Sequence, residues 1–159
     1  MKLRTVTGDD VDQVLALNAQ SVTELSPMGR DELSTYLQMP ATCLVCESDD
    51  RQVAAFALAF EPLTAYGSIN YGWHAERFDD FLYLDRIAVH PNFRRQGLAS
   101  LLYDEMEQRA TSHARMVCEV NSDPPNPASL AFHLGRGYIE VGHLTQLDGH
   151  QTVMLEKRL

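Results

Sequence analysis

An apolar run that leads through a basic glycine loop into an amphipathic segment constrains the fold of this chain most strongly. Residues 81–89 are mostly apolar and predict a buried strand, and residues 95–110 carry apolar side chains at helical spacing. Between them, Gly97 lets the backbone turn tightly and lets an anion approach closely. Free N–H groups at a helix start attract negative charge, and Arg94 and Arg95 add two positive charges. The segment therefore predicts a strand–loop–helix unit that binds a pyrophosphate.

Length and hydropathy favour one globular domain over residues 1–159. The longest uninterrupted apolar run, residues 53–60, is too short to span a bilayer. The first residues turn acidic at Asp9 and Asp10 and contain no hydrophobic signal region. We therefore expect a cytoplasmic protein that has no membrane partner.

The net charge of −9 argues against nucleic acid as a partner, because binding to phosphate backbones requires a basic face. An acidic balance suits a cationic or amine substrate. It also makes the adjacent pair Arg94 and Arg95 stand out as a local site for an anion.

The cysteine pattern predicts buried free thiols and no metal site. Cys43 and Cys46 form a lone CxxC within an apolar, strand-like run. A redox CxxC is expected at a helix start, where the thiolate is stabilised, and a zinc site would need a second cysteine pair.

Periodicity and turn signals predict the remaining elements. The first helix follows a cap at Thr7 or Asp9, and Gly135 and Gly137 end the last helix. Residues 61–80 form a long aromatic loop. Its Tyr and Trp side chains are expected to pack at the sheet edge or to line a substrate pocket. The expected strands are residues 2–6, 42–47, 52–60, 81–89, 116–120, 138–147 and 151–155, and the first helix has the apolar stripe Val11, Val14, Leu15 and Val22, with Asn18 on the same face. A short second helix covers residues 31–37.

A second motif lies in the helix that begins at Asn126-Pro127. Asn126, Ser129 and His133 recur at helical spacing and share one face. A polar stripe on a short helix that is otherwise built for packing suggests a groove beside it. Asn126 can cap the helix and also contact a cofactor, because the cap uses only its side-chain oxygen.

The two motifs together resemble those of the Gcn5-related N-acetyltransferase (GNAT) superfamily. Residues 94–99, Arg-Arg-Gln-Gly-Leu-Ala, match its Gln/Arg-x-x-Gly-x-Gly/Ala motif for the pyrophosphate of coenzyme A. Residues 126–138 resemble the helix that follows and that ends in Gly-Phe or Gly-Tyr. The resemblance implies an α/β (α+β) GNAT acyltransferase fold. That fold has a mixed, mostly antiparallel sheet of about seven strands, flanked by about four helices, with the fourth and fifth strands splayed apart.

The resemblance also implies the residues that bind acetyl-CoA. The backbone N–H of Val89 would stabilise the oxyanion of the attacked thioester, at a bulge in the fourth strand. The remaining cofactor contacts that the resemblance implies are Ile87, Ala88, Arg94, Arg95, Gln96, Gly97, Leu98, Ala99, Asn126, Ser129 and His133.

The acceptor amine must lose a proton, and two carboxylates are candidate bases. Asp85 would act through water, and the alternative is that it forms an ion pair with a nearby arginine or serves as a cap. Glu119 is the second candidate, with Asn121 to orient it. Strand periodicity places Tyr83 on the same face as Asp85, beside the acceptor. Asn18 either contacts the acceptor or is a satisfied buried amide.

His133 occupies the position where many family members carry a tyrosine that protonates the departing thiolate. An imidazole has a reference pKa of ~6.5, compared with ~8.5 for a thiol, and it must be protonated to donate. The alternative is that His133 packs beside the cofactor arm or hydrogen-bonds Ser129 or a backbone carbonyl.

The resemblance implies an N-acetyltransferase that transfers acetyl from acetyl-CoA to a primary amine of a small molecule or peptide by direct attack. The alternative is a catalytically weakened acyl-CoA-binding module with a regulatory role. An ATP-binding role is disfavoured because the loop lacks the Gly-Lys-Ser/Thr ending of a P-loop. Dimerisation is common in similar proteins, and no sequence patch decides between a monomer and a homodimer.

Overall fold

The computed structural model describes residues 1–21 and 23–159 and divides them into two compact units. The first unit contains residues 1–60 and 84–108, and the second contains residues 61–83 and 109–159. Val22, which the sequence assigned to the stripe of the first helix, lies outside the described residues.

Seven strands of the described chain form one mixed sheet in the order β1-β2-β3-β4-β5-β7-β6. The pairs are antiparallel in β1–β2, β2–β3, β5–β7 and β6–β7, whereas β4 and β5 are parallel. The parallel register joins Leu82 to Met116 and Tyr83 to Val117. A parallel ladder confined to the start of β4 fits the predicted splay of the fourth and fifth strands. The strands are β1 (Lys2–Thr5), β2 (Ala41–Glu47), β3 (Val53–Phe60), β4 (Leu82–Val89), β5 (Arg115–Asp123), β6 (Ile139–Thr145) and β7 (Gln151–Arg158).

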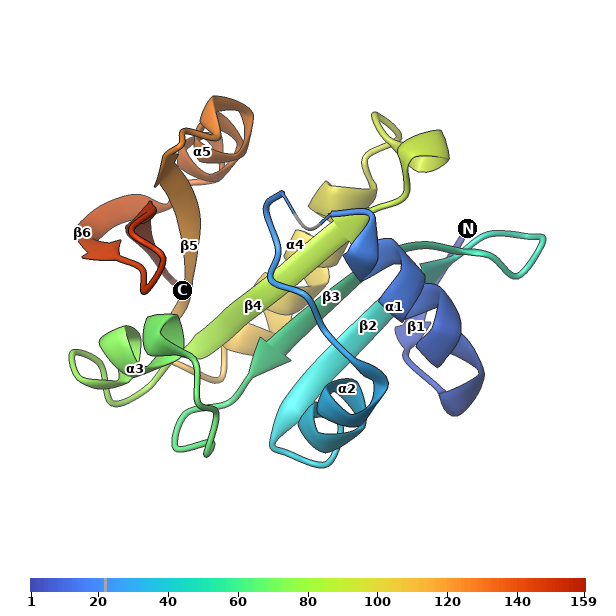
Figure 1. Ribbon diagram of the computed structural model, residues 1–159, viewed down its shortest axis with the longest axis horizontal. Coiled ribbons are helices and arrows are strands. Elements are labelled where there is room, and N and C mark those ends of the chain that lie inside the picture. Colours follow the sequence, from blue (N-terminus) through green and yellow to red (C-terminus); the bar gives the residue numbers. More distant parts are fainter. Residues whose placement is uncertain (22) are drawn as a thin grey trace. The chain divides into compact units, whose positions relative to one another are not determined.

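The first unit is built around β3, in which every residue is buried. A strand that is apolar throughout is expected where helices cover both faces of a sheet. Figure 1 shows α1 and α2 on one face of β2 and β3 and α4 on the other. The helices of this unit are α1 (Val11–Ala19), α2 (Arg30–Tyr36) and α4 (Leu98–Ala110), which reaches two residues beyond it.

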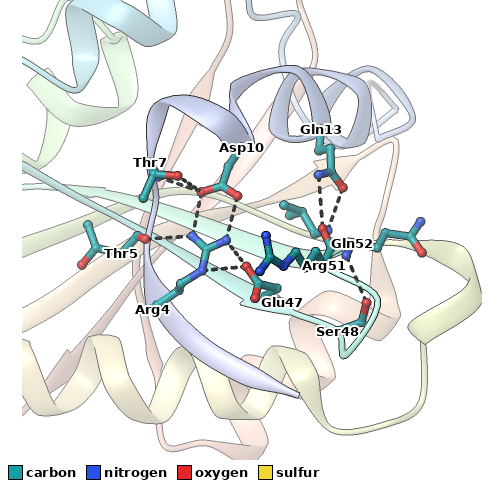
Figure 2. Close-up of polar contacts among 10 residues, drawn as sticks. Arg4, Thr5, Thr7, Asp10, Gln13, Glu47, Ser48, Arg51 and Gln52 are labelled. Atoms are coloured by element: carbon teal, nitrogen blue, oxygen red, sulfur yellow. Dashed lines mark hydrogen bonds and ion pairs between the residues drawn. The ribbon is translucent and has the colours of Figure 1, made fainter.

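A cluster of ionised side chains fixes the start of the first unit (Figure 2). The Arg4 guanidinium donates to both carboxylate oxygens of Asp10, at 2.7 and 2.8 Å, and to Glu47 on β2, at 2.9 Å from Nε. Asp10 also accepts from the backbone N–H and hydroxyl of Thr7, at 2.7 and 2.9 Å. Hydrogen bonding to Arg4 lowers the pKa of Asp10 to about 2. The cluster joins β1 and β2 to the turn that leads into α1.

The second unit contains the hairpin of β6 and β7, paired through β7 with β5, together with α3 (Ile69–Ala75) and α5 (Pro127–Gly135). Asn126 caps α5, because its side-chain oxygen accepts the N–H of Ser129 at 3.2 Å, as predicted. Gly149 has a φ of 89° in the predicted hairpin turn, and Gly137 has a φ of 90° after α5.

The predicted loop over residues 61–80 is wrong in one respect, because it contains α3. Ser68 caps this helix, and the Trp73 ring lies against Gly142 of β6, where it occupies the space that a Cβ atom would need. The contact between Trp73 on the helix and a glycine on a distant strand leaves no local sequence signal. The described chain therefore has five α-helices rather than about four.

The other differences concern element ends and the core face of α1. β5 and β7 extend beyond the predicted residues 116–120 and 151–155. On α1 the buried face contains Val14, Leu17 and Asn18, whereas Leu15 is half-buried. Cys43 and Cys46 are buried free thiols, as predicted, and the structure adds Cys118 as a third. Burial raises the pKa of Cys43 to about 12.

Candidate active site

The loop before α4 exposes main-chain amides. Gly97 has a φ of 79°, and its carbonyl oxygen accepts the first helical bond from Leu101 at 3.0 Å. Among residues 1–21 and 23–159, the N–H groups of Gln96, Gly97 and Leu98 have no backbone acceptor. A Cβ atom added at Gly97 would meet no protein atom within 4 Å. The backbone at this turn is open to a ligand.

Arg94 and Arg95 come directly before these amides in the chain; both are exposed, and Arg95 adopts a φ of 61°. Gln96 is exposed and donates to the carbonyl of Asn92 at 3.4 Å, whereas Leu98 is buried and anchors the helix. The amides at the helix start and the two guanidinium groups can donate hydrogen bonds to a diphosphate, and the glycine leaves room for it.

The end of β4 places Ile87, Ala88 and Val89 ahead of this loop. Ala88 is buried and its two neighbours are half-buried, as expected for alternating strand positions. The N–H of His90, directly after the strand, donates to Ala54 of β3 at 2.8 Å. β4 is thereby held against β3 where the predicted cofactor residues lie.

Asp85 is paired with its neighbour Arg86. Arg86 Nε lies 2.6 Å from Oδ2 of Asp85, and the side chains are 4% and 6% exposed. Arg86 also donates to Oδ1 of Asn18 at 2.9 Å and to the carbonyl of Ser26 at 3.2 Å. Of the interpretations of Asp85, the ion pair is the one that this geometry favours.

Asn18 has the contacts of a satisfied buried amide. It is 1% exposed, its oxygen accepts from Arg86, and its nitrogen donates to Ser26 at 3.1 Å. Together, Asn18 and Arg86 tie the chain after α1 to β4. The geometry favours this structural interpretation of Asn18 over contact with the acceptor.

Glu119 lies among neutral donors in the second unit. Its Oε1 accepts from the hydroxyl of Tyr83 at 2.8 Å and from Nδ2 of Asn70 at 3.0 Å. Asn121, two residues later, is half-buried at a register shift of β5, and its carbonyl accepts the N–H of Asn126 at 3.1 Å. The structure thus brings Tyr83 to Glu119 and joins Asn121 to the start of α5.

His133 is buried on α5, where its Nδ1 lies 2.7 Å from the carbonyl oxygen of Ser129. A carbonyl only accepts, so Nδ1 carries a hydrogen. The imidazole stands edge-on to Phe132 and Tyr138, with ring centroids 5.6 and 5.3 Å away. The bond to Ser129 was one of the alternatives for His133, and it fixes the tautomer of the neutral ring with Nε2 as the acceptor.

The aromatic side chains of the second unit pack on one another. The Tyr71 ring lies 5.5 Å from those of Phe81 and Tyr83, and His74 stacks on Phe78 at 6.3 Å. Burial lowers the pKa of His74 to about 4. Packing at the sheet edge, one of the two expectations for this segment, accounts for these contacts.

Sequence reasoning missed Arg86, Asn70 and Gln146. Arg86 had a signal, because it is a charged residue inside a mostly apolar strand and beside a carboxylate. Asn70 and Gln146 had no such signal, because each is an ordinary polar residue in the sequence. Their side chains meet across 76 positions, where Gln146 Nε2 donates to Asn70 Oδ1 at 2.6 Å.

Comparison with known proteins identifies the class. Residues 12–138 match the family described as the acetyltransferase (GNAT) family. Since the match covers most of the chain, the protein belongs to the GNAT family, and acetyl-CoA is its cofactor. No helix in the described part of the chain is both long and apolar enough to cross a membrane.

Solved structures share the fold at low sequence identity. The ribosomal-protein-alanine N-acetyltransferase from Brucella melitensis is 19% identical, with all of each chain covered and a TM-score of 0.74. Ard1 from Thermoplasma volcanium is 15% identical, covers 99% of this chain and 97% of its own, and has a TM-score of 0.77. A phosphinothricin acetyltransferase from Sinorhizobium meliloti, solved with AcCoA, is 18% identical, with 99% and 88% covered and a TM-score of 0.74. A sequence comparison with curated proteins finds no match.

Proposed function

We propose that this protein is an N-acetyltransferase that moves acetyl from acetyl-CoA to a primary amine of a small molecule or peptide. The observation that carries the proposal is the open turn at Gly97, whose amides have no backbone acceptor in the described chain. A chain of the GNAT family with this turn has the donors that a CoA pyrophosphate requires. The family match runs through both units, which supports the prediction of one functional domain over residues 1–159.

Bound acetyl-CoA supplies a thioester that an amine can attack directly. The amides of Gln96, Gly97 and Leu98, with Arg94 and Arg95, hold the diphosphate, and the uncrowded first turn at Ala99 leaves room for it. Ile87 and Ala88 would line the cofactor arm, and the N–H of Val89 would donate to the thioester oxygen when acetyl-CoA is bound. The family resemblance implies that Asn126 and Ser129 of α5 also contact the cofactor.

For proton removal we assign Glu119 the role of base. Its carboxylate is bonded to a phenol and an amide, both neutral groups, whereas that of Asp85 is bonded to a buried guanidinium. A carboxylate that faces a fixed positive charge holds its negative charge more strongly and accepts a proton less readily. Asn121 and Tyr83 orient the acceptor beside Glu119, and Asp85 and Asn18 support the strand.

For protonation of the departing thiolate we assign His133. Since Nδ1 donates its hydrogen bond to the carbonyl of Ser129, the proton transferred to the thiolate must be the one on Nε2 of the imidazolium. Turnover should therefore decrease as the imidazole loses its proton. His133→Ala is expected to bind CoA as before and to turn over more slowly, and an unchanged pH profile would remove His133 from the mechanism.

A catalytically weakened acyl-CoA-binding module is the second candidate. The observation that favours it is His133 in place of the family's tyrosine. Such a protein would bind acyl-CoA, and no amine would accelerate release of the thiol.

One experiment separates the candidates. CoA binding is measured by calorimetry, and thiol release from acetyl-CoA is measured over a panel of amines, amino acids and peptides. Gly97→Val is expected to lose CoA binding, because the side chain enters the open turn. Gly149→Val is the matched control: it has the same positive φ and open surroundings, and it lies in the hairpin turn.

Binding together with amine-dependent release supports the enzyme. Binding without release supports the module. Absence of CoA binding at millimolar concentration, or equal binding loss in the Gly97 and Gly149 variants, would overturn the assignment of the turn.

A further inference from the structure

A chain of polar side chains leads from the β6–β7 hairpin to Glu119. Gln146, directly after β6, donates through Nε2 to Oδ1 of Asn70 at 2.6 Å and to the hydroxyl oxygen of Thr152 at 3.0 Å. Asn70, in the first turn of α3, donates through Nδ2 to Oε1 of Glu119 at 3.0 Å. All four residues belong to the second unit.

The directions of these hydrogen bonds are determined by the groups involved. A carboxylate only accepts, so the atom of Asn70 that faces Glu119 must be the NH₂ group, and the atom that faces Gln146 must be its oxygen. The Thr152 hydroxyl lies 3.3 Å from the carbonyl of Leu144 and donates to it, which leaves its oxygen to accept from Gln146. Two of these hydrogen bonds lead to Glu119, because Gln146 donates to Asn70 and Asn70 donates to the carboxylate.

The elements that carry this chain are fixed in the same unit. The hydroxyl of Tyr71 on α3 donates to the carbonyl of Glu61 at 2.7 Å, and Trp73 lies against Gly142. The backbone of Gln146 is held in the hairpin, where its N–H donates to His150 at 2.7 Å and its carbonyl accepts from Gly149 at 2.9 Å. A donor chain on rigid elements can hold a carboxylate in one orientation.

We propose that Asn70 and Gln146 are positioning residues for Glu119, so that α3 and the β6–β7 hairpin set the orientation and the basicity of this carboxylate. The proposal rests on the proposed function, in which Glu119 is the base. Hydrogen bonds to the ionised form favour that form, and both Asn70 and Tyr83 donate to the same oxygen, Oε1. Removal of the Asn70 donor therefore makes Glu119 bind a proton more readily and leaves the carboxylate freer to rotate.

The groups described beside Glu119 come from β4, α3 and β7. On β4 the neighbour is the phenol of Tyr83, and on α3 the imidazole of His74 lies 5.8 Å from the Tyr83 ring. β7 places the uncharged Met154 opposite Glu119. Because the pKa of His74 is about 4, its ring is neutral at neutral pH.

The first measurement does not depend on turnover. The Glu119 carboxyl carbon is followed by ¹³C NMR against pH in the full chain labelled at glutamate, with the signal assigned by Glu119→Gln. Asn70→Leu removes the donor and is expected to raise the titration midpoint of Glu119. Asn70→Asp places a second carboxylate at hydrogen-bond distance and is expected to raise the midpoint further, because two like charges repel. Gln146→Leu is expected to raise it least.

The second measurement uses the best acceptor from the amine panel. Asn70→Leu is expected to lower kcat about tenfold with little change in the KM for acetyl-CoA, as for loss of one hydrogen bond to a charged group. Asn70→Asp should move the acidic limb of the kcat/KM profile in the same direction as the NMR midpoint. The double variant Asn70→Leu/Gln146→Leu should be no slower than Asn70→Leu, since Gln146 acts through Asn70.

Gln151→Leu, an exposed change on β7 of the same hairpin, is the control and should leave the midpoint and kcat unchanged. If the Asn70 variants lower only the unfolding temperature, and both the Glu119 midpoint and the pH profile stay as in the parent, Asn70 is structural and the inference is overturned. If the midpoint moves as expected and no amine releases thiol even from the parent protein, the proposed function fails while the orientation of Glu119 by Asn70 is established.

Discussion

Asp85 and Glu119 are carboxylates on neighbouring strands of the sheet, and their surroundings differ in charge. Asp85 in the first unit lies 2.6 Å from a guanidinium that is itself buried, whereas Glu119 in the second unit accepts from a phenol and an amide. A buried ion pair loses much stability when either member is removed, because the other charge is left uncompensated. A carboxylate among neutral donors can change its protonation state at lower cost. The comparison indicates that two candidate bases from the sequence can be separated by the charge of their partners.

The largest effect should come from exchanging the two carboxylates for amides. Glu119→Gln is expected to lower kcat/KM by about 10²- to 10⁴-fold, as for loss of a general base. Asp85→Asn is expected to lower it less than about tenfold, because this side chain supports the strand. Steady-state kinetics with the best acceptor measure kcat/KM for both variants, and unfolding temperatures show whether either variant is destabilised. The opposite ranking would make Asp85 the base.

The second-largest effect should be a loss of stability when the Arg86 guanidinium is removed. Arg86→Leu leaves Asp85 buried without its cation and is expected to cost about 3–5 kcal/mol of unfolding free energy in urea titrations. The control is Arg30→Leu, which breaks an exposed pair with Asp12 and should cost about 0–1 kcal/mol. Equal losses in the two variants would contradict the assignment of a buried pair at Asp85.

The second unit should lose stability first on acidification. The pKa of His74 is lowered from 6.5 to about 4 by burial, so the folded state binds this proton less readily than the unfolded chain does. Stability is full above about pH 6.5 and falls as the pH drops toward 4, by up to about 3 kcal/mol. His74→Phe should flatten the dependence of urea midpoints on pH over this interval, and His143→Gln, at an exposed site, should preserve it. An unchanged slope in His74→Phe would show that another group titrates.

The smallest effect concerns Asp10 in the first unit. Because Arg4 lowers its pKa from 3.8 to about 2, its contribution is complete above pH 3.8 and is lost as the pH falls toward 2. Asp10→Asn should therefore reduce stability at neutral pH and remove part of the acid transition below pH 3.8. Amide hydrogen exchange at pH 5 should distinguish the two units, since protection should decrease around α3 while β1 and β2 stay protected.

Much of the fold could be predicted from local patterns. Alternation and apolar runs gave the strands, turn residues gave their limits, and the cap at Asn126 and the turn at Gly149 follow from side-chain chemistry at single positions. The glycine loop at Gly97 could be found because one short segment holds a strand end, two arginines and a helix start. Features that depend on neighbours a few residues away can be predicted from the sequence.

The tertiary structure decided the features that depend on distant partners. The contact of Trp73 on α3 with Gly142 on β6 is one of them, and the roles of Asn70 and Gln146 appear only when side chains 49 and 76 positions apart meet. The same holds for Asn18, which reaches Arg86 across 68 positions. Local sequence was enough to indicate which groups are available for acyl transfer and where an anion can bind. Folding decided which carboxylate faces a cation and which faces neutral donors, because that depends on side chains that the chain brings together only in three dimensions.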